Sequence, residues 1–315
     1  MKTVRNIIRK GLLIPIIALT ACNPCPRFEP NIQYCVTEKR VQALPTPFPP
    51  LSKGELQTLW GKELYLGSCF ADEADFYRAI TAFKSALYLI PKKEFDRRSQ
   101  IEYNIVLSYY FAGKYKEALE AFEGSTLFCL PPSFPATREL LILLYDLYDK
   151  QGFCDKREKI LQVLKEKYPE EAEKLLLSDA IVTGDFCTLN DHTDNDTINT
   201  LLYEYAILQK SPEKAGQLQA LLPGAGYYYV GLKNAATTSF LINALFIAGT
   251  YQLFKKGYPA LAVFTLSLEA GWYFGGINGA QLAANEFNER LYENLAKEAL
   301  TQEKLFPVLM FQYAF

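Results

Sequence analysis

The sequence predicts an all-α protein, in which a helical-repeat domain precedes a hydrophobic helical hairpin. Half of the 315 residues are hydrophobic, which is enough for a large core. Ala79, Ala118 and Arg157 take the same place in successive repeats, since 118 − 79 = 39 and 157 − 118 = 39. Two long apolar stretches, residues 235–254 and 259–282, follow the repeats, and each is long enough to cross a bilayer.

Residues 1–21 are predicted to be an export signal. Four basic residues come before an uncharged apolar run from Gly11 to Ala21, which is too short to remain as a membrane-spanning helix. The following Leu19-Thr20-Ala21-Cys22 resembles the lipobox of bacterial lipoproteins. The resemblance implies that Cys22 carries fatty acid such as palmitate, and that the protein is a membrane-anchored lipoprotein of the bacterial cell envelope. It would face the periplasm, with the outer membrane favoured over the inner. An ordinary secretory signal with an incidental cysteine is the alternative.

Residues 22–51 are predicted to form an extended tether between the lipid and the folded domain. Seven prolines interrupt this segment, and proline fixes φ and lacks an amide donor, so a continuous helix is excluded. Ser52 and Glu55 then have the spacing of a capping box. This pair predicts the start of the first helix and of a repeat domain over residues 52–222.

Three helix-turn-helix units are predicted over residues 60–171. The clearest contains Leu66-Gly67-x2-Phe70, followed by Ala79-x3-Phe83 and Pro91. This pattern resembles the tetratricopeptide repeat (TPR), in which each unit buries its apolar face against a neighbour. The resemblance implies a TPR-like α-solenoid of three to four helical hairpins, the weakest over residues 197–222. Five positions depart from the family pattern: Glu63, Glu102, Val106, Tyr145 and Arg157.

The TPR resemblance also implies a function in binding. Such solenoids present the first helix of each unit on a concave face, where a protein or peptide partner is held. The candidate partner-binding residues are Leu64, Tyr103, Leu107, Tyr110 and Ile142.

Residues 223–300 are predicted to form a Pro-Gly turn and a hydrophobic helical hairpin, followed by a C-terminal tail over residues 301–315. The Pro-Gly-x-Gly turn, three tyrosines and two apolar helices resemble the TM2-like modules of bacterial envelope proteins. We expect the hairpin to associate with a membrane, with packing on the end of the solenoid as the alternative. The candidate seam between its helices consists of Gly271, Gly275 and Gly279.

Glu269 is the only charged residue within the second apolar stretch. We expect its carboxylate to fix the hairpin register through a hydrogen bond to a hydroxyl or to Asn243, with a proton or substrate site as the alternative.

Composition narrows the function. A net charge of −2 provides no electrostatic basis for binding nucleic acid. The single histidine, His192, has no cysteine at ligand spacing, and no nucleophile–base motif or phosphate loop occurs, so no metal, cofactor or enzymatic activity is expected. We therefore expect a lipid-anchored envelope scaffold that binds protein or peptide partners through a TPR solenoid. An integral membrane component of envelope assembly or transport, with the hairpin as its working part, is the alternative.

Overall fold

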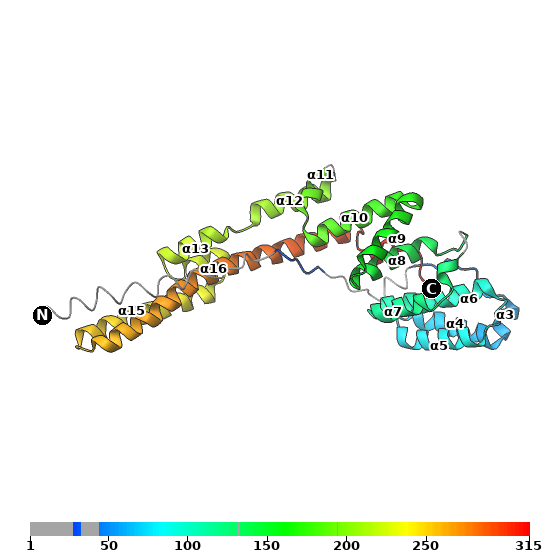
Figure 1. The fold of residues 1–315 in the computed structure, drawn as a ribbon, viewed down its shortest axis with the longest axis horizontal. Coiled ribbons are helices and arrows are strands. Elements are labelled where there is room, and N and C mark those ends of the chain that lie inside the picture. The colour runs from blue at the N-terminus through cyan, green and yellow to red at the C-terminus, as the bar shows by residue number, and fades with distance from the viewer. Residues whose placement is uncertain (1–27, 33–43, 131–132, 194) are drawn as a thin grey trace. The chain divides into compact units, whose positions relative to one another are not determined.

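The structure of this protein is a computed structural model in which every assigned element is a helix (Figure 1). It describes residues 28–32, 44–130, 133–193 and 195–315. Because no strand occurs over these ranges, the predicted all-α fold is confirmed. The predicted signal, the predicted lipidation site Cys22 and most of the predicted tether lie outside the described residues.

The described residues fall into two compact units. The repeat unit comprises the described residues of 32–201 together with 296–315, and the hairpin unit comprises residues 28–31 and 202–295. The helices of the repeat unit are α3 (Lys53–Gln57), α4 (Leu59–Asp72), α5 (Phe76–Leu89), α6 (Phe95–Phe111), α7 (Tyr115–Glu123), the 3-10 turn η2 (Leu127–Cys129), α8 (Thr137–Lys150), α9 (Cys154–Lys167), α10 (Pro169–Thr183), α11 (Phe186–Asp191) and α17 (Pro307–Met310).

Every second connection between helices of the repeat unit, beginning with that from α4 to α5, is a turn of one kind. Each of these turns contains a residue with left-handed φ: Ala74 (58°), Gly113 (69°), Gly152 (73°) and Gly184 (69°). The first three have the 39-residue spacing of the predicted repeats, since 113 − 74 = 39 and 152 − 113 = 39. Glycine reaches this conformation at no steric cost, which accounts for its presence at three of the four turns. The helices therefore form the pairs α4/α5, α6/α7, α8/α9 and α10/α11.

Close packing of α4 on α5 depends on Gly67. A Cβ atom built on this residue would lie 2.5 Å from two ring carbons of Phe83. Phe83 is fully buried, as are Ala79 and Ala86 on the same helix. Small residues thus let the two helices approach closely while one phenylalanine fills the space between them.

The pair α10/α11 was not predicted from the sequence. Pro169 occupies the first turn of α10, where proline is tolerated, so it begins a helix as well as following α9. The predicted fourth pair is present as α12 (Asp196–Leu208) and α13 (Pro212–Leu221), and Ser211 caps the second of these by accepting a hydrogen bond from the amide of Lys214. The part of α12 from Leu202 onward, and all of α13, belong to the hairpin unit.

The other helices of the hairpin unit are α14 (Ala225–Val230), α15 (Lys233–Lys255) and α16 (Pro259–Gln302), and the last of these ends in the repeat unit. A short turn with Gly257 at φ 82° joins α15 to α16. Ala215, Val230, Ala280 and Ala284 form a small core between α13, α14 and α16. Gly226 permits this packing, because a Cβ atom there would lie 2.3 Å from the carbonyl oxygen of Ala215.

Candidate functional site

An extended segment, Phe311–Phe315, is bound on the aromatic side chains of α5 and α6. The ring of Phe315 lies 6.2 Å from the rings of both Phe76 and Phe83 and 5.8 Å from that of Phe111, measured between centroids. Its side chain is only 6% exposed. Ring pairs at these separations attract each other beyond their burial of apolar surface, so Phe315 contributes an anchor.

Phe311 provides a second anchor four residues earlier. Its ring lies 5.9 Å from that of Tyr110 and 6.0 Å from that of Phe111. The four receiving residues, Phe76, Phe83, Tyr110 and Phe111, together form what we call the tail site.

The backbone of this segment is also held. The amide of Ala314 donates a 3.0 Å hydrogen bond to the carbonyl of Pro45. Just before the segment, Arg138 donates a 3.1 Å hydrogen bond to the carbonyl of Met310, the last residue of α17. Main-chain hydrogen bonds combined with anchoring side chains are the usual way in which proteins hold an extended peptide. The end of the C-terminal tail therefore packs against helices of the repeat unit.

The five candidate partner-binding residues are core residues. Leu64, Tyr103, Leu107, Tyr110 and Ile142 are between 0 and 5% exposed. Tyr110 is covered by Phe311, and Tyr103 packs on Phe48 and Phe134 at 5.8 and 6.0 Å. We expected these side chains to line an open face, and the structure corrects this expectation. They are apolar residues of first helices that pack inside the repeat unit instead of facing a partner.

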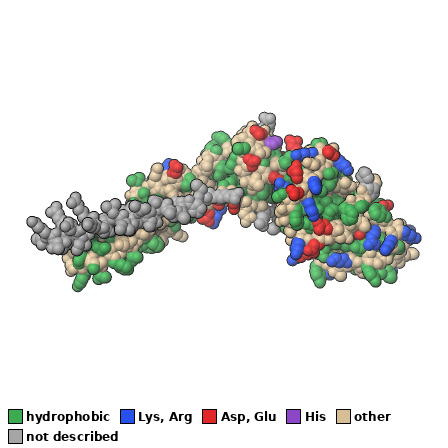
Figure 2. Space-filling model, viewed as in Figure 1, with side chains coloured by type: hydrophobic (Ala, Val, Ile, Leu, Met, Phe, Trp, Pro, Cys, Tyr) green, Lys and Arg blue, Asp and Glu red, His purple; other side chains and the backbone are tan. Residues whose placement is uncertain are grey.

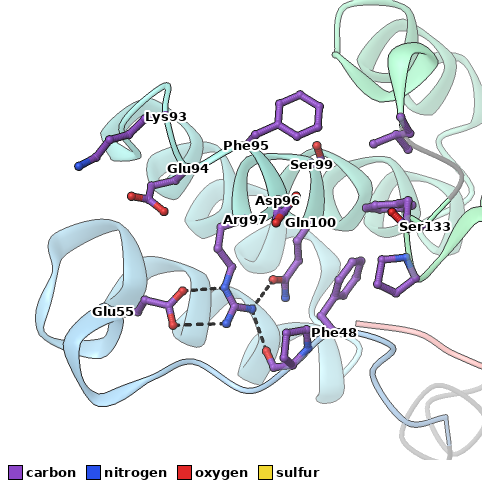
Figure 3. Close-up of a pocket in the computed structure, with 14 residues that line it drawn as sticks. Phe48, Glu55, Lys93, Glu94, Phe95, Asp96, Arg97, Ser99, Gln100 and Ser133 are labelled. Atoms are coloured by element: carbon purple, nitrogen blue, oxygen red, sulfur yellow. Dashed lines mark hydrogen bonds and ion pairs between the residues drawn. The ribbon is translucent and has the colours of Figure 1, made fainter.

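Arg97, near the start of α6, fastens the end of the proline-rich segment to the repeats (Figure 3). Its guanidinium donates to Oε1 of Glu55 at 2.7 Å and to the carbonyls of Pro49 and Pro50 at 2.8 and 3.0 Å. It also donates to Oε2 of Glu55 at 3.3 Å and to the side-chain oxygen of Gln100 at 2.8 Å. The sequence indicated the Ser52–Glu55 capping box, which is present, but gave no sign that Glu55 also binds Arg97.

The same contact changes the acidity of Glu55. Hydrogen bonds from Arg97 are the main cause that lowers the pKa of Glu55 from 4.5 to about 2, against an opposing effect of desolvation. Glu55 is therefore ionised at every physiological pH, and the pair remains closed.

A pocket of about 510 Å³ lies beside the Glu55–Arg97 pair, and both residues contribute to its lining. Phe48, Phe95 and Phe134 provide apolar walls, and Ser99 also lines the pocket (Figure 3). The Ser99 hydroxyl is buried and has no hydrogen-bond partner among the described residues. Charged side chains, among them Lys93, Glu94 and Asp96, line the rest of the pocket, so it could accept a small group that carries both apolar and polar atoms.

The outer surface of the α15/α16 hairpin is apolar (Figure 2). Many of its large hydrophobic side chains are between 48 and 71% exposed. They include Phe240, Leu241, Leu245, Ile247, Tyr251 and Phe254 on α15, and Leu261, Val263, Phe264, Leu266, Trp272 and Phe274 on α16.

Polar side chains take the inner positions of the same hairpin. Ser239, Asn243 and Thr250 on α15 and Glu269 on α16 are all buried. On α15 the buried positions recur every three, four or seven residues, so they share one helical face. A soluble helical hairpin has the opposite distribution, with apolar residues inside.

Glu269 lacks the hydrogen bond that the sequence led us to expect. Its Oε2 atom and Oδ1 of Asn243 are both buried without a partner among the described residues. The Asn243 amide instead donates to the carbonyl of Ser239 at 2.6 Å. The described contacts therefore do not include a register-fixing bond from Glu269.

The glycine seam is only partly formed. A Cβ atom on Gly279 would lie 2.2 Å from the hydroxyl of Tyr227 on α14, whereas Cβ atoms on Gly271 and Gly275 would have no described atom within 4 Å. Successive glycines of the seam are four residues apart, and each such step rotates about 40° around the helix axis. Of the three, only Gly279 therefore lies on the face of α16 that packs against another helix. The element that covers it is α14, rather than the predicted α15.

One helix of the described chain, beginning at Pro259, is long and apolar enough to cross a membrane. Only 11% of its most apolar stretch is buried, which distinguishes it from the core helix of a soluble protein. This exposure is compatible with membrane association.

The comparisons with known proteins identify no family. No protein-family model matches the chain, and no solved structure matches it. Over the described residues, no group of three or more histidine, cysteine, aspartate or glutamate side chains is placed to hold a metal ion.

Proposed function

We propose that this protein is a membrane-held scaffold of the bacterial cell envelope, in which TPR-like repeats bind a protein or peptide partner. The α15/α16 hairpin and fatty acid on Cys22 hold it at the membrane. The repeats face the periplasm, from the outer membrane in preference to the inner.

The main support for this proposal is the α15/α16 hairpin, which exposes large apolar side chains and buries polar ones. Each large side chain on its outer surface would gain roughly 1.5–3 kcal/mol on leaving water, and a dozen such residues lie there together. The apolar residues 259–282 span about 36 Å as a helix, compared with about 30 Å for the hydrocarbon core of a bilayer. Both observations favour lipid as the surroundings of the hairpin.

The binding part of the proposal is supported by the bound segment Phe311–Phe315. The repeat unit already holds this extended segment through two aromatic anchors and the backbone hydrogen bond of Ala314, and Arg138 holds the carbonyl of Met310 just before it. Surfaces that hold an extended segment of their own chain have the chemistry needed to hold one from another protein.

To test whether the hairpin alone keeps the protein in the membrane, the lipid anchor is removed. The chain is exported from a cleavable non-lipoprotein signal with Cys22→Ser, and membranes are washed with carbonate. We expect retention. The double variant Leu245→Lys, Phe264→Lys places charges on the outer surface and should release the protein, whereas Tyr88→Lys, on the exposed face of α5, should not. Release of the parent chain would contradict the proposal.

A second function is a membrane component of transport or envelope assembly with the hairpin as its working part. It is favoured by Oε2 of Glu269 and Oδ1 of Asn243, which are buried and have no hydrogen-bond partner in the part of the chain that the structure describes. Ionisable groups inside apolar helices commonly mark a path for a proton or substrate. Glu269→Gln should then abolish function in cells while leaving membrane retention intact. A fully active Glu269→Gln variant would exclude this alternative.

A further inference from the structure

The bound segment Phe311–Phe315 has the features of a ligand. Phe311 and Phe315 insert their rings against the tail site, while Tyr313 between them is 36% exposed. The segment is extended at Phe311, with φ −62° and ψ 131°. Ala314 is only 1% exposed. Recognition therefore uses two aromatic rings four residues apart with a small residue before the second, and leaves the exposed Gln312 and Tyr313 free to vary.

A short turn connects α16 to this segment. Helix α16 ends at Gln302, and Lys304 then adopts a φ of 54°, the left-handed conformation that commonly ends a helix. The amide of Leu305 donates a 2.8 Å hydrogen bond to the carbonyl of Leu300, so the turn is closed by α16 itself.

We propose that the tail site is a peptide-binding site whose resident ligand is Phe311–Phe315, and that its partner is an extended peptide with two phenylalanine or tyrosine side chains four residues apart. The partner competes with the resident segment for the same four aromatic residues. This inference rests on the proposed binding function and adds the class of partner and the means of its control.

Competition sets the affinity that is observed. A segment joined by a short connection acts at an effective concentration in the millimolar range, so a free peptide meets a site that is almost always occupied. The apparent affinity is reduced by the fraction of open sites. Removal of the resident segment should therefore strengthen binding of an added peptide by at least tenfold.

The test uses detergent-solubilised chain that ends at Lys304 and a fluorescent peptide with the sequence of residues 305–315. We expect saturable binding, at least tenfold tighter than to the full chain. A peptide with Phe311→Ala and Phe315→Ala should not bind, whereas the matched Tyr313→Ala peptide should bind like the parent. A serine-rich peptide with two phenylalanines four residues apart should bind, and one with them two residues apart should not.

Two further measurements keep the test decisive. If the shortened chain loses its helical circular dichroism, a protease site is inserted after Lys304 and the folded full chain is cut there; the cut segment should then exchange with the labelled peptide. Absence of binding and of exchange, or equal binding by full and shortened chains, would overturn the inference. The same preparations are tested for retention in vesicles, because release from vesicles would overturn the membrane proposal instead.

Discussion

The hydroxyl of Tyr110 on α6 donates a 2.7 Å hydrogen bond to Oδ2 of Asp146 on α8. Both side chains are buried, and Oδ1 of the same carboxylate accepts a 2.6 Å bond from Lys150. The pairing recurs in the next hairpin, where the Tyr145 hydroxyl donates to Asp179 on α10. Successive first helices of the repeat unit are therefore joined by tyrosine–aspartate bonds, which fix their alignment more specifically than apolar packing alone.

Tyr110→Phe should lower the free energy of unfolding by about 1–3 kcal/mol, because Asp146 would remain buried and lose one donor. The ring, and with it the contact to Phe311, would be kept. Urea unfolding followed by circular dichroism measures the change. Tyr77→Phe is the matched control, since Tyr77 is 83% exposed on α5, and equal losses in both variants would contradict a specific role for the bond.

The Glu55–Arg97 pair predicts a dependence of stability on pH. The folded pKa of Glu55, about 2, lies below its ordinary value of 4.5, so the pair stabilises the fold fully above about pH 4.5 and loses this contribution as pH falls toward 2. Because Glu55 is 25% exposed, solvent screening reduces the contribution to about 1–2 kcal/mol.

Glu55→Gln should accordingly destabilise the chain at pH 7 and have little effect at pH 2, as measured by unfolding at a series of pH values. Glu117→Gln, on the exposed surface of α7, controls for the loss of one carboxylate. A pH-independent effect of Glu55→Gln would show that the capping box, rather than the charge pair, is responsible.

Gly279 and Gly275, two glycines of the candidate seam, should respond differently to a large side chain. Gly279→Leu should cost at least about 1–3 kcal/mol, since its side chain would enter the space of Tyr227. Gly275→Leu should be tolerated in the isolated protein, because a Cβ atom there has no described neighbour within 4 Å. Thermal unfolding in detergent compares the two. Equal disruption by Gly275→Leu would indicate that another helix covers this position in solution.

Acylation of Cys22 stays a prediction from the sequence Leu19-Thr20-Ala21-Cys22. Cys22→Ser should abolish incorporation of labelled fatty acid and leave an unprocessed precursor. The neighbouring Cys25→Ser should leave both labelling and processing unchanged. Labelling that persists in the Cys22→Ser variant would disprove the assignment.

The sequence by itself determined the helical hairpins and their period. Glycine at the turns of the second and third units, small residues such as Gly67 and aromatic residues such as Phe83 act between neighbours a few residues or one repeat apart, so their spacing is visible along the chain. The apolar hairpin was predicted in the same way, from two uninterrupted stretches.

Only the tertiary structure decided which surfaces are covered. A first-helix aromatic residue such as Tyr110 looks the same in sequence whether it faces a partner or the fold, and here Phe311, about 200 residues away, covers it. The pairing of Arg97 with Glu55 and the open space beside Gly275 are equally long-range properties. The spacing of residue types along the chain reports local helix geometry. Burial depends instead on which distant segments come into contact, and the spacing does not reveal those contacts.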